Sequence, residues 1–345
     1  MSIVTHSNPE AFPSVLRQKR QLVSNALDEN AAMATEQTTI KEKCPGCGNE
    51  EMNYHTLQLR IPVRDDNYAY IMMSTPTKSG VRPEAVFVDP YDVPKVRAAA
   101  HELGLKDSDI VGLLTTHKHF DHAGGNKNFM QQYPNLPSYG SSSDIPTVSH
   151  VLHDGESTTL FENSAAIRLS AYATPCHTRD STCFLAEDMR SEEELARTPA
   201  GVQQGSKGDK KRGVFTGDTL FISGCGRFFE GTPAEMNRAL NVVLAGLPQD
   251  ALVYCGHEYT ASNAKFSNTV LPERPAILSL LEDLASKRNN GVTTGLYTLA
   301  EEREHNPFML VNDPHVQRIT GSQDPVEVLR ILREAKNQGF LPSSI

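Results

Sequence analysis

The chain has 345 residues, of which 38% are hydrophobic and 22% charged, a composition typical of a globular protein with two domains or with one domain and an extension. Its formal net charge of −9 argues against binding nucleic acid or an anionic membrane through bulk charge. No apolar run approaches the roughly 18 residues that a membrane span needs, so we expect a soluble protein.

Residues 1–53 are expected to form a mobile arm, because they lack periodic apolar positions and are rich in small and polar residues. Within the arm, Cys44 and Cys47 have the spacing of half a zinc knuckle. Since no second pair follows, a turn with two thiols is favoured over a zinc site. Scattered cysteines indicate a reducing compartment, so we expect a cytoplasmic protein. A weakly basic N-terminus keeps a mitochondrial destination open.

From about residue 54, strand-like and helical segments alternate, which predicts a layered α/β domain. Helical spacing covers 93–103, between the first two expected strands. A polar, glycine-containing stretch at about 188–212 interrupts the pattern and is expected to be an exposed insertion. The expected strands are 85–88, 110–115, 166–173, 213–215 and 251–254.

After Glu258 the strand signal stops and helical patterns follow. Apolar residues between 275 and 288 recur on one helical face. Capping-box spacing occurs at Thr232/Glu235, before an expected helix over 236–244, and at Thr298/Glu301 and Asp324/Glu327. We therefore expect a catalytic domain over 54–257 and a small helical domain over 258–345.

The strongest chemical signal is a dense group of metal-ligand residue types between 117 and 122, after a strand-like run. It contains His117, His119, Asp121 and His122, and Gly124 and Gly125 follow. Histidines two apart on an extended chain point the same way, and the Asp-His pair can reach a second ion. Burying such a group without a ligand would leave polar atoms unsatisfied. The alternative, a chance surface cluster, is disfavoured.

Three further ligand candidates each follow an expected strand: His177, Asp218 and His257. Open α/β folds place their sites at strand ends, so the repetition favours ligands over isolated structural residues. Five histidines and two aspartates are too many for one tetrahedral ion. The set predicts two divalent ions that share a carboxylate and activate a water molecule. Zn²⁺ is favoured, with Fe and Mn as alternatives. The four cysteines outside the arm are interpreted as small packing residues.

The chain resembles glyoxalase II, hydroxyacylglutathione hydrolase, within the metallo-β-lactamase superfamily. The superfamily signature is Thr-His-x-His-x-Asp-His, and the longer strings together are specific to the family. The resemblance covers residue 55 to the C-terminus. The strings are TTHKHFDHAGGN at 115–126, ATPCHT at 173–178, FTGDTLF at 215–221, GCGRFFEG at 224–231, YCGHEYT at 254–260 and NPFM at 306–309.

This resemblance implies a metallo-β-lactamase αββα sandwich followed by a small helical substrate-binding domain. It implies one metal on His117, His119 and His177, and a second on Asp121, His122 and His257, with Asp218 bridging. The implied reaction is hydrolysis of S-D-lactoylglutathione to D-lactate and glutathione, in methylglyoxal detoxification, with Asp121 and Asp218 as catalytic residues. Residues implied to contact glutathione are Arg227, Tyr259, Arg333 and Lys336, together with Phe229, which stands where the family often has Tyr.

Three other functions use parts of the same pattern. A persulfide dioxygenase-like enzyme needs only a mononuclear iron site, and a noncatalytic metal-binding protein would be expected to have lost a ligand. A nuclease of the same superfamily is disfavoured by the acidic balance. For Arg333 and Lys336 the alternative is a solvated basic helix face. The expected partner is therefore a small glutathione thioester, with no nucleic acid and no membrane, and the expected state is a monomer.

Overall fold

The computed structural model describes residues 57–63, 66–74, 81–161, 167–191, 212–286 and 291–339. The expected arm with Cys44 and Cys47, and nearly all of the expected insertion, lie outside the described residues. The ends of that insertion fall on the last residue of one strand, Asp188, and the first of the next, Arg212. These two strands pair antiparallel, with Arg212 opposite Glu187.

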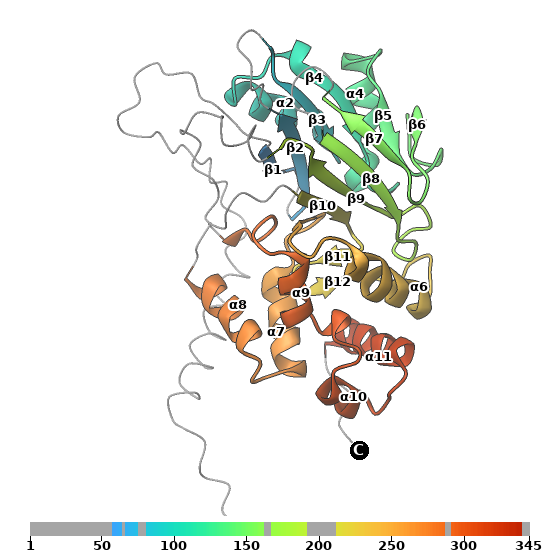
Figure 1. Ribbon diagram of the computed structural model, residues 1–345, viewed down its shortest axis with the longest axis vertical. Helices are drawn as coiled ribbons and strands as arrows, with labels where there is room; N and C mark the ends of the chain where they lie inside the picture. Colours follow the sequence, from blue (N-terminus) through green and yellow to red (C-terminus); the bar gives the residue numbers. More distant parts are fainter. Residues whose placement is uncertain are drawn as a thin grey trace, which may run out of the picture.

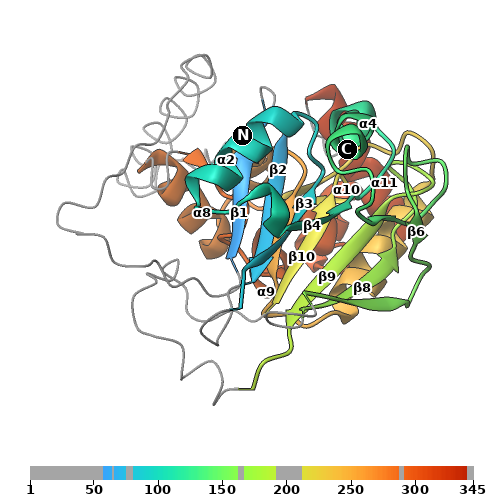
Figure 2. The same ribbon diagram turned by 90° about the horizontal axis from the view of Figure 1, so that it is seen from above.

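Two mixed sheets form the centre of the molecule (Figures 1 and 2). The first has the order β1-β2-β3-β4-β5-β6 and the second the order β13-β10-β9-β8-β7, while β11 and β12 form a short separate hairpin. The first sheet contains β1 (Leu57–Pro62), β2 (Tyr68–Ser74), β3 (Glu84–Val88), β4 (Ile110–Leu114), β5 (Ser138–Gly140) and β6 (His150–Val151). The other strands are β7 (Ser157–Leu160), β8 (Ile167–Ala173), β9 (Thr182–Asp188), β10 (Arg212–Gly217), β11 (Leu220–Phe221), β12 (Gly224–Cys225) and β13 (Leu252–Cys255).

Helices cover the outer faces of the sheets. Figure 2 shows α2 and α4 over the first sheet, and Figure 1 shows the C-terminal helices gathered at one end of the second. The first group is α2 (Val93–Glu102), α3 (Phe120–Ala123) and α4 (Asn126–Gln132). The others are α6 (Pro233–Arg238), α7 (Thr260–Val270), α8 (Pro275–Ala285), α9 (Leu299–His305), α10 (Pro314–Thr320) and α11 (Pro325–Gln338). Short 3-10 turns are η1 (Asp107–Asp109), η3 (Leu244–Gly246) and η5 (Pro307–Met309).

Alternating side chains of β2 show why the layers pack. Ile71 and Met73 pack in the core under α2 and α4, whereas Tyr70 and Met72 pack between the two sheets. Both faces of this strand are thus buried, as in sheets covered on both sides. A third core lies between the second sheet and the C-terminal helices. The expected αββα sandwich with a helical C-terminal region is confirmed.

The helix starts largely follow the predicted caps. Capping boxes are present at Thr232/Glu235 and Thr298/Glu301. The third prediction is wrong in one part, because Asp324 caps the N–H of Val326 but Glu327 bonds to Arg330 instead of the helix start. The helix expected over 236–244 is also irregular. It continues from α6 into a π-helical turn, η2 (Ala239–Val243), and then into η3.

Among the described residues, no helix is long and apolar enough to cross a membrane.

Candidate metal centre

The ligand candidates lie where four strands end. His117 and His119 follow β4, and Asp121 and His122 stand in the first turns of α3. His177 follows β8, Asp218 follows β10 and His257 follows β13. Backbone hydrogen bonds hold these ends together: Thr182 N–H donates to Thr116 O between the two sheets, and Gly256 N–H donates to Gly217 O between neighbouring strands of the second sheet. The predicted ligands therefore converge from segments up to 140 residues apart in the chain (117 to 257).

The seven candidate side chains form three overlapping groups whose ligand atoms lie within 4.8 Å of one another. In the first group, Nδ1 of His119 lies 2.9 Å from Nε2 of His177 and 3.2 Å from Nε2 of His117. In another, Nε2 of His122 lies 3.3 Å from Nε2 of His257. The groups are His117/His119/His177, His117/His122/Asp218 and Asp121/His122/His257.

Asp218 lies between the two sides of this cluster. Its Oδ2 is 3.3 Å from Nε2 of His177 and 3.3 Å from Nε2 of His257. Its buried Oδ1 accepts no hydrogen bond in the described part of the chain, and Nε2 of His122 lies 3.4 Å from it. A buried carboxylate oxygen left unpaired is costly, but a cation would satisfy it. The residues present therefore fit divalent metal ions.

The electrostatics of the cluster also favour positive charge. Burial alone would raise the pKa of Asp218, but His122 and His257 hold it well below its usual range. Burial would likewise lower the pKa of His257, but Asp218 and Asp66 raise it to about 9. Burial keeps the pKa of His117 well below its ordinary value, so this imidazole is neutral and its lone pair is free to bind a metal.

Each buried histidine of the cluster turns its second ring nitrogen toward a fixed oxygen atom. Nδ1 lies 2.9 Å from Asp89 Oδ2 in His122 and 3.0 Å from Asp66 Oδ1 in His257. In His177 it lies 3.1 Å from the carbonyl oxygen of Arg227. With Nδ1–H donating to these oxygens, Nε2 presents its lone pair to the cluster. This is the arrangement usual for metal-binding histidines.

Sequence reasoning missed Asp66 and Asp89. Asp89 is buried and also accepts hydrogen bonds from the N–H and hydroxyl of Thr116, at 2.8 and 2.6 Å. Its backbone has a positive φ of 46°. One signal could have identified it, because Asp89 directly follows the strand β3, as the ligand candidates follow theirs. Nothing local marks Asp66, which reaches His257 across 191 positions.

Two glycines allow the backbone to approach the cluster. Gly217, with φ +46°, would place a Cβ 2.6 Å from the hydroxyl of Thr116. A Cβ on Gly256 would lie 2.2 Å from Oδ1 of Asp218. A larger residue at Gly256 would displace the carboxylate, and one at Gly217 would displace Thr116, so glycine is required at both strand ends.

Two of the predicted substrate residues lie at the rim of the cluster. Phe229 is 60% exposed and its ring centroid lies 5.2 Å from that of His177. Tyr259 stacks on His257 with ring centroids 4.9 Å apart. Arg227 is exposed in the same loop as Phe229. Phe229 therefore lies beside the His177 side of the cluster and Tyr259 beside the His257 side.

Arg333 and Lys336 both lie on α11. Arg333 is only 6% exposed, donates from Nη1 to the carbonyl oxygen of Cys225 and lies over the ring of Phe308. Lys336 donates to the carbonyl oxygen of Ser262 and lies over the ring of Phe266. The alternative of a solvated basic face is therefore wrong for Arg333.

The four described cysteines are free and buried, as interpreted from the sequence. Burial raises the pKa of Cys176 and of Cys183 to about 12, which keeps both thiols protonated and unreactive.

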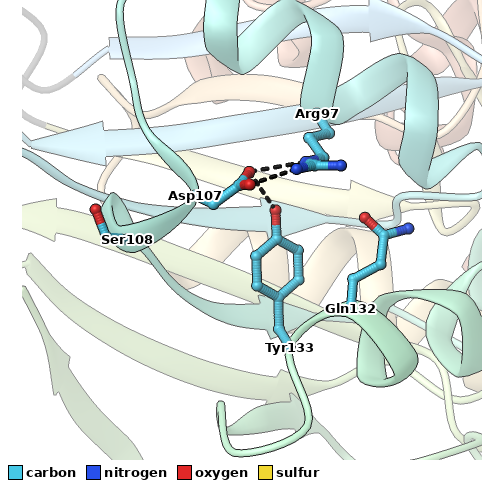
Figure 3. Close-up of a pocket in the computed structure, with 5 residues that line it drawn as sticks. All are labelled: Arg97, Asp107, Ser108, Gln132 and Tyr133. Atoms are coloured by element: carbon cyan, nitrogen blue, oxygen red, sulfur yellow. Dashed lines mark hydrogen bonds and ion pairs between the residues drawn. The ribbon is translucent and has the colours of Figure 1, made fainter.

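A cleft of about 390 Å³ lies apart from the metal centre, on the outer helical layer (Figure 3). Its charged groups satisfy one another, because Asp107 accepts from Arg97 Nε at 2.7 Å and from the Tyr133 hydroxyl at 3.0 Å. No ligand candidate of the metal centre lines it. We assign this cleft no role in the chemistry.

Comparison with known proteins adds to this geometry. Residues 88–257 match the model of the metallo-beta-lactamase superfamily, and residues 258–339 match that of the hydroxyacylglutathione hydrolase C-terminus. A probable hydroxyacylglutathione hydrolase of Schizosaccharomyces pombe is 42% identical over 275 residues, which is 79% of this chain and 94% of that protein. The cytoplasmic hydroxyacylglutathione hydrolase of Arabidopsis thaliana is 38% identical over 279 residues, 81% of this chain and 97% of that one.

A solved structure supports the fold alone. The crystal structure of ETHE1 from Myxococcus xanthus matches with a TM-score of 0.51 at 21% identity, covering 84% of this chain and 93% of that chain.

Proposed function

The chain belongs to the hydroxyacylglutathione hydrolase family of the metallo-β-lactamase superfamily, and from this membership we propose that it hydrolyses S-D-lactoylglutathione to D-lactate and glutathione. The observation that carries the proposal is the convergence of all seven ligand candidates at one set of strand ends. The persulfide dioxygenase-like and noncatalytic alternatives are not favoured, because the relatives named above are hydroxyacylglutathione hydrolases.

The proposed centre takes two divalent ions, with Zn²⁺ favoured and Fe or Mn as alternatives. His117, His119 and His177 would hold one ion, and Asp121, His122 and His257 the other. Asp218 would be shared, since it lies within 3.3–3.4 Å of histidines on both sides. When bound, the ions supply Lewis acidity that activates water and polarises the thioester carbonyl.

The chain's own residues orient this chemistry. Asp121 is the more exposed of the two carboxylates, at 28% for its side chain, and Asn67 donates to its Oδ2 at 3.3 Å. Asp121 can therefore accept a hydrogen bond from the attacking water and hold it toward the carbonyl. The water would lose one proton and form a bond to the carbonyl carbon, and the C–S bond then breaks to leave the carboxylic acid and a thiolate. Because a thiol has a pKa of about 8.5, the thiolate leaves without a dedicated general acid.

The substrate would lie between the two parts of the chain, with 54–257 as the catalytic domain and 258–345 as the glutathione-binding domain. Arg227 and Lys336 would meet the glutathione carboxylates, and Tyr259 would donate a hydrogen bond. Phe229 offers only an apolar ring beside His177, so one hydrogen bond of the family pattern would be lost here. Arg333 would line the site while bonded to Cys225.

Lys336 gives a pH test of this assignment. Burial, with Arg333 beside it, lowers the pKa of Lys336 to about 8. The side chain is therefore charged below about pH 8 and neutral above it. We expect KM for the glutathione thioester to rise by up to about fivefold as the pH passes 8, because a partly exposed ion pair contributes up to about 1 kcal/mol. Steady-state kinetics between pH 7 and 9.5 measure this rise.

Two controls separate the effect of Lys336 on KM from other effects of pH. Lys336→Arg keeps its charge throughout the range, so the rise in KM between pH 7 and 9.5 should disappear in this variant. A small thioester without the glutathione carboxylates should show no lysine-dependent change. The same rise in wild type and in Lys336→Arg would place the glutathione carboxylates elsewhere. Lys336 is preferred to Arg333 for this test, because Arg333→Ala would also remove the bond to Cys225.

A further inference from the structure

Side chains of the C-terminal helices bind the backbone of the hairpin formed by β11 and β12. The N–H of Ser223 donates to the carboxylate of Glu302 at 2.9 Å, and Nδ2 of Asn306 donates to Gly224 O at 3.0 Å. Three more bonds come from Asn263 to Ile222 O, Ser267 to Ser223 O and Arg333 to Cys225 O. Every residue of the hairpin from 222 to 225 is thus bound by the helical region.

The hairpin is buried and its conformation needs this support. Ser223, Ser267, Glu302 and Asn306 all have an exposed fraction of 0%. Ser223 has a φ of 59°, which is uncommon for a residue other than glycine and persists only where the surroundings hold it. Burial raises the pKa of Glu302 to about 8, although Asn306 and the Ser223 amide lower it. The buried carboxyl group of Glu302 is held by hydrogen bonds from the Ser223 amide and from Nδ2 of Asn306.

The hairpin also connects two of the proposed metal ligands. It begins two residues after Asp218, and the hydroxyl of Thr216 donates to Leu220 O at 2.7 Å. At its other end, Gly226 N–H donates to Thr219 O, and the next carbonyl, that of Arg227, lies 3.1 Å from Nδ1 of His177. A Cβ on Gly226 would lie 1.9 Å from the backbone oxygen of Asp218. A shift of the hairpin must therefore move Asp218, His177 or both.

We propose that Glu302 and Asn306 are positioning residues of the metal centre, which hold Asp218 and the ring of His177 in place through the β11–β12 hairpin. The C-terminal helices then have a second role besides contacting glutathione: they set how tightly the metal is held. This inference rests on the proposed function, because it takes Asp218 and His177 as metal ligands.

The test measures metal retention and not only turnover. Wild type, Asn306→Ala, Glu302→Ala and Glu302→Gln are loaded with Co²⁺, and the visible absorption of the bound Co²⁺ is followed after addition of excess EDTA. Asn306→Ala and Glu302→Ala should release Co²⁺ about 10–100-fold faster than wild type, the usual cost of losing a group that orients a ligand. Glu302→Gln retains one oxygen for both donors and should restore most of the retention.

Val316→Ala is the matched control for stability alone. Val316 is fully buried in α10 and belongs to the same hydrophobic core, but it makes none of the hairpin bonds. It should lower the melting temperature while Co²⁺ release stays at the wild-type rate. The Co²⁺ spectrum should change in Asn306→Ala and not in Val316→Ala.

The outcomes separate this inference from the proposed function. If wild type retains Co²⁺ and folded Asn306→Ala releases it at the wild-type rate, the positioning role is wrong and the proposed function stands. The same holds if Val316→Ala releases Co²⁺ as fast as Asn306→Ala. If Glu302→Ala does not fold, the rates of Co²⁺ release from Asn306→Ala and Glu302→Gln still test the positioning role. A wild-type chain that binds no Co²⁺ would overturn the proposed metal centre itself.

Discussion

Replacing Asp218 by alanine should abolish metal binding and thioester hydrolysis together. Asp218 is buried between His122, His177 and His257, and its carboxylate supplies the negative charge that both sides of the cluster share. Without it, two cations would have to bind among neutral imidazoles with only Asp121 as a charged ligand. We expect kcat to fall by more than about 10²-fold, beyond the effect of losing a group that merely orients a ligand. Metal analysis and kinetics on one preparation measure both losses.

Asp250→Asn is the control for this substitution. Asp250 precedes β13, at the end opposite His257, and forms a half-exposed ion pair with Arg212 at 3.2 Å. A pair of this kind contributes little, so metal content and kcat should stay near wild type. An Asp218→Ala protein that keeps its metal and full activity would refute the shared role of Asp218.

Asp89 is expected to show the second largest effect. Its carboxylate accepts from Thr116 twice and lies 2.9 Å from Nδ1 of His122, in a buried position. Asp89→Ala leaves these donors buried without acceptors and should lower the free energy of unfolding by about 3 kcal/mol or more. Denaturant unfolding of the metal-free chain measures this loss.

Asp89→Asn separates the effect on His122 from the effect on the fold. Asparagine keeps the shape and one acceptor but loses the charge that orients the imidazole. Metal affinity should fall about 10–100-fold, with a smaller loss of stability than in Asp89→Ala. Wild-type metal affinity in a folded Asp89→Asn chain would show that His122 needs no such partner.

The sequence predicts the ligand candidates well because each stands in a short local pattern, a strand followed by His or Asp. His177, Asp218 and His257 each occupy such a position, and the structure brings them together with the 117–122 segment. The layered fold follows from the same alternation of strands and helices. The five expected strands correspond to β3, β4, β8, β10 and β13, and the other described strands were not predicted. Among them, β2 is a continuous apolar run with no alternation to mark it.

The partners of the ligands could not be predicted from local patterns. Asp66 meets His257, and Glu302 meets Ser223, only because the fold joins distant segments. Burial of Arg333 has the same origin: from helical spacing alone it shares a face with Lys336, but the hairpin covers it. Such contacts depend on tertiary packing, which periodicity does not encode.

The central claim is that this chain hydrolyses a glutathione thioester at a centre of two metal ions. Metal content per chain and turnover of S-D-lactoylglutathione, measured on the same sample before and after removal of metal, test it most directly. We expect about two divalent ions per chain, thioester hydrolysis that disappears with the metal, and recovery when Zn²⁺ is restored. Undiminished turnover in the metal-free chain, or a single iron per chain without thioester turnover, would contradict the account.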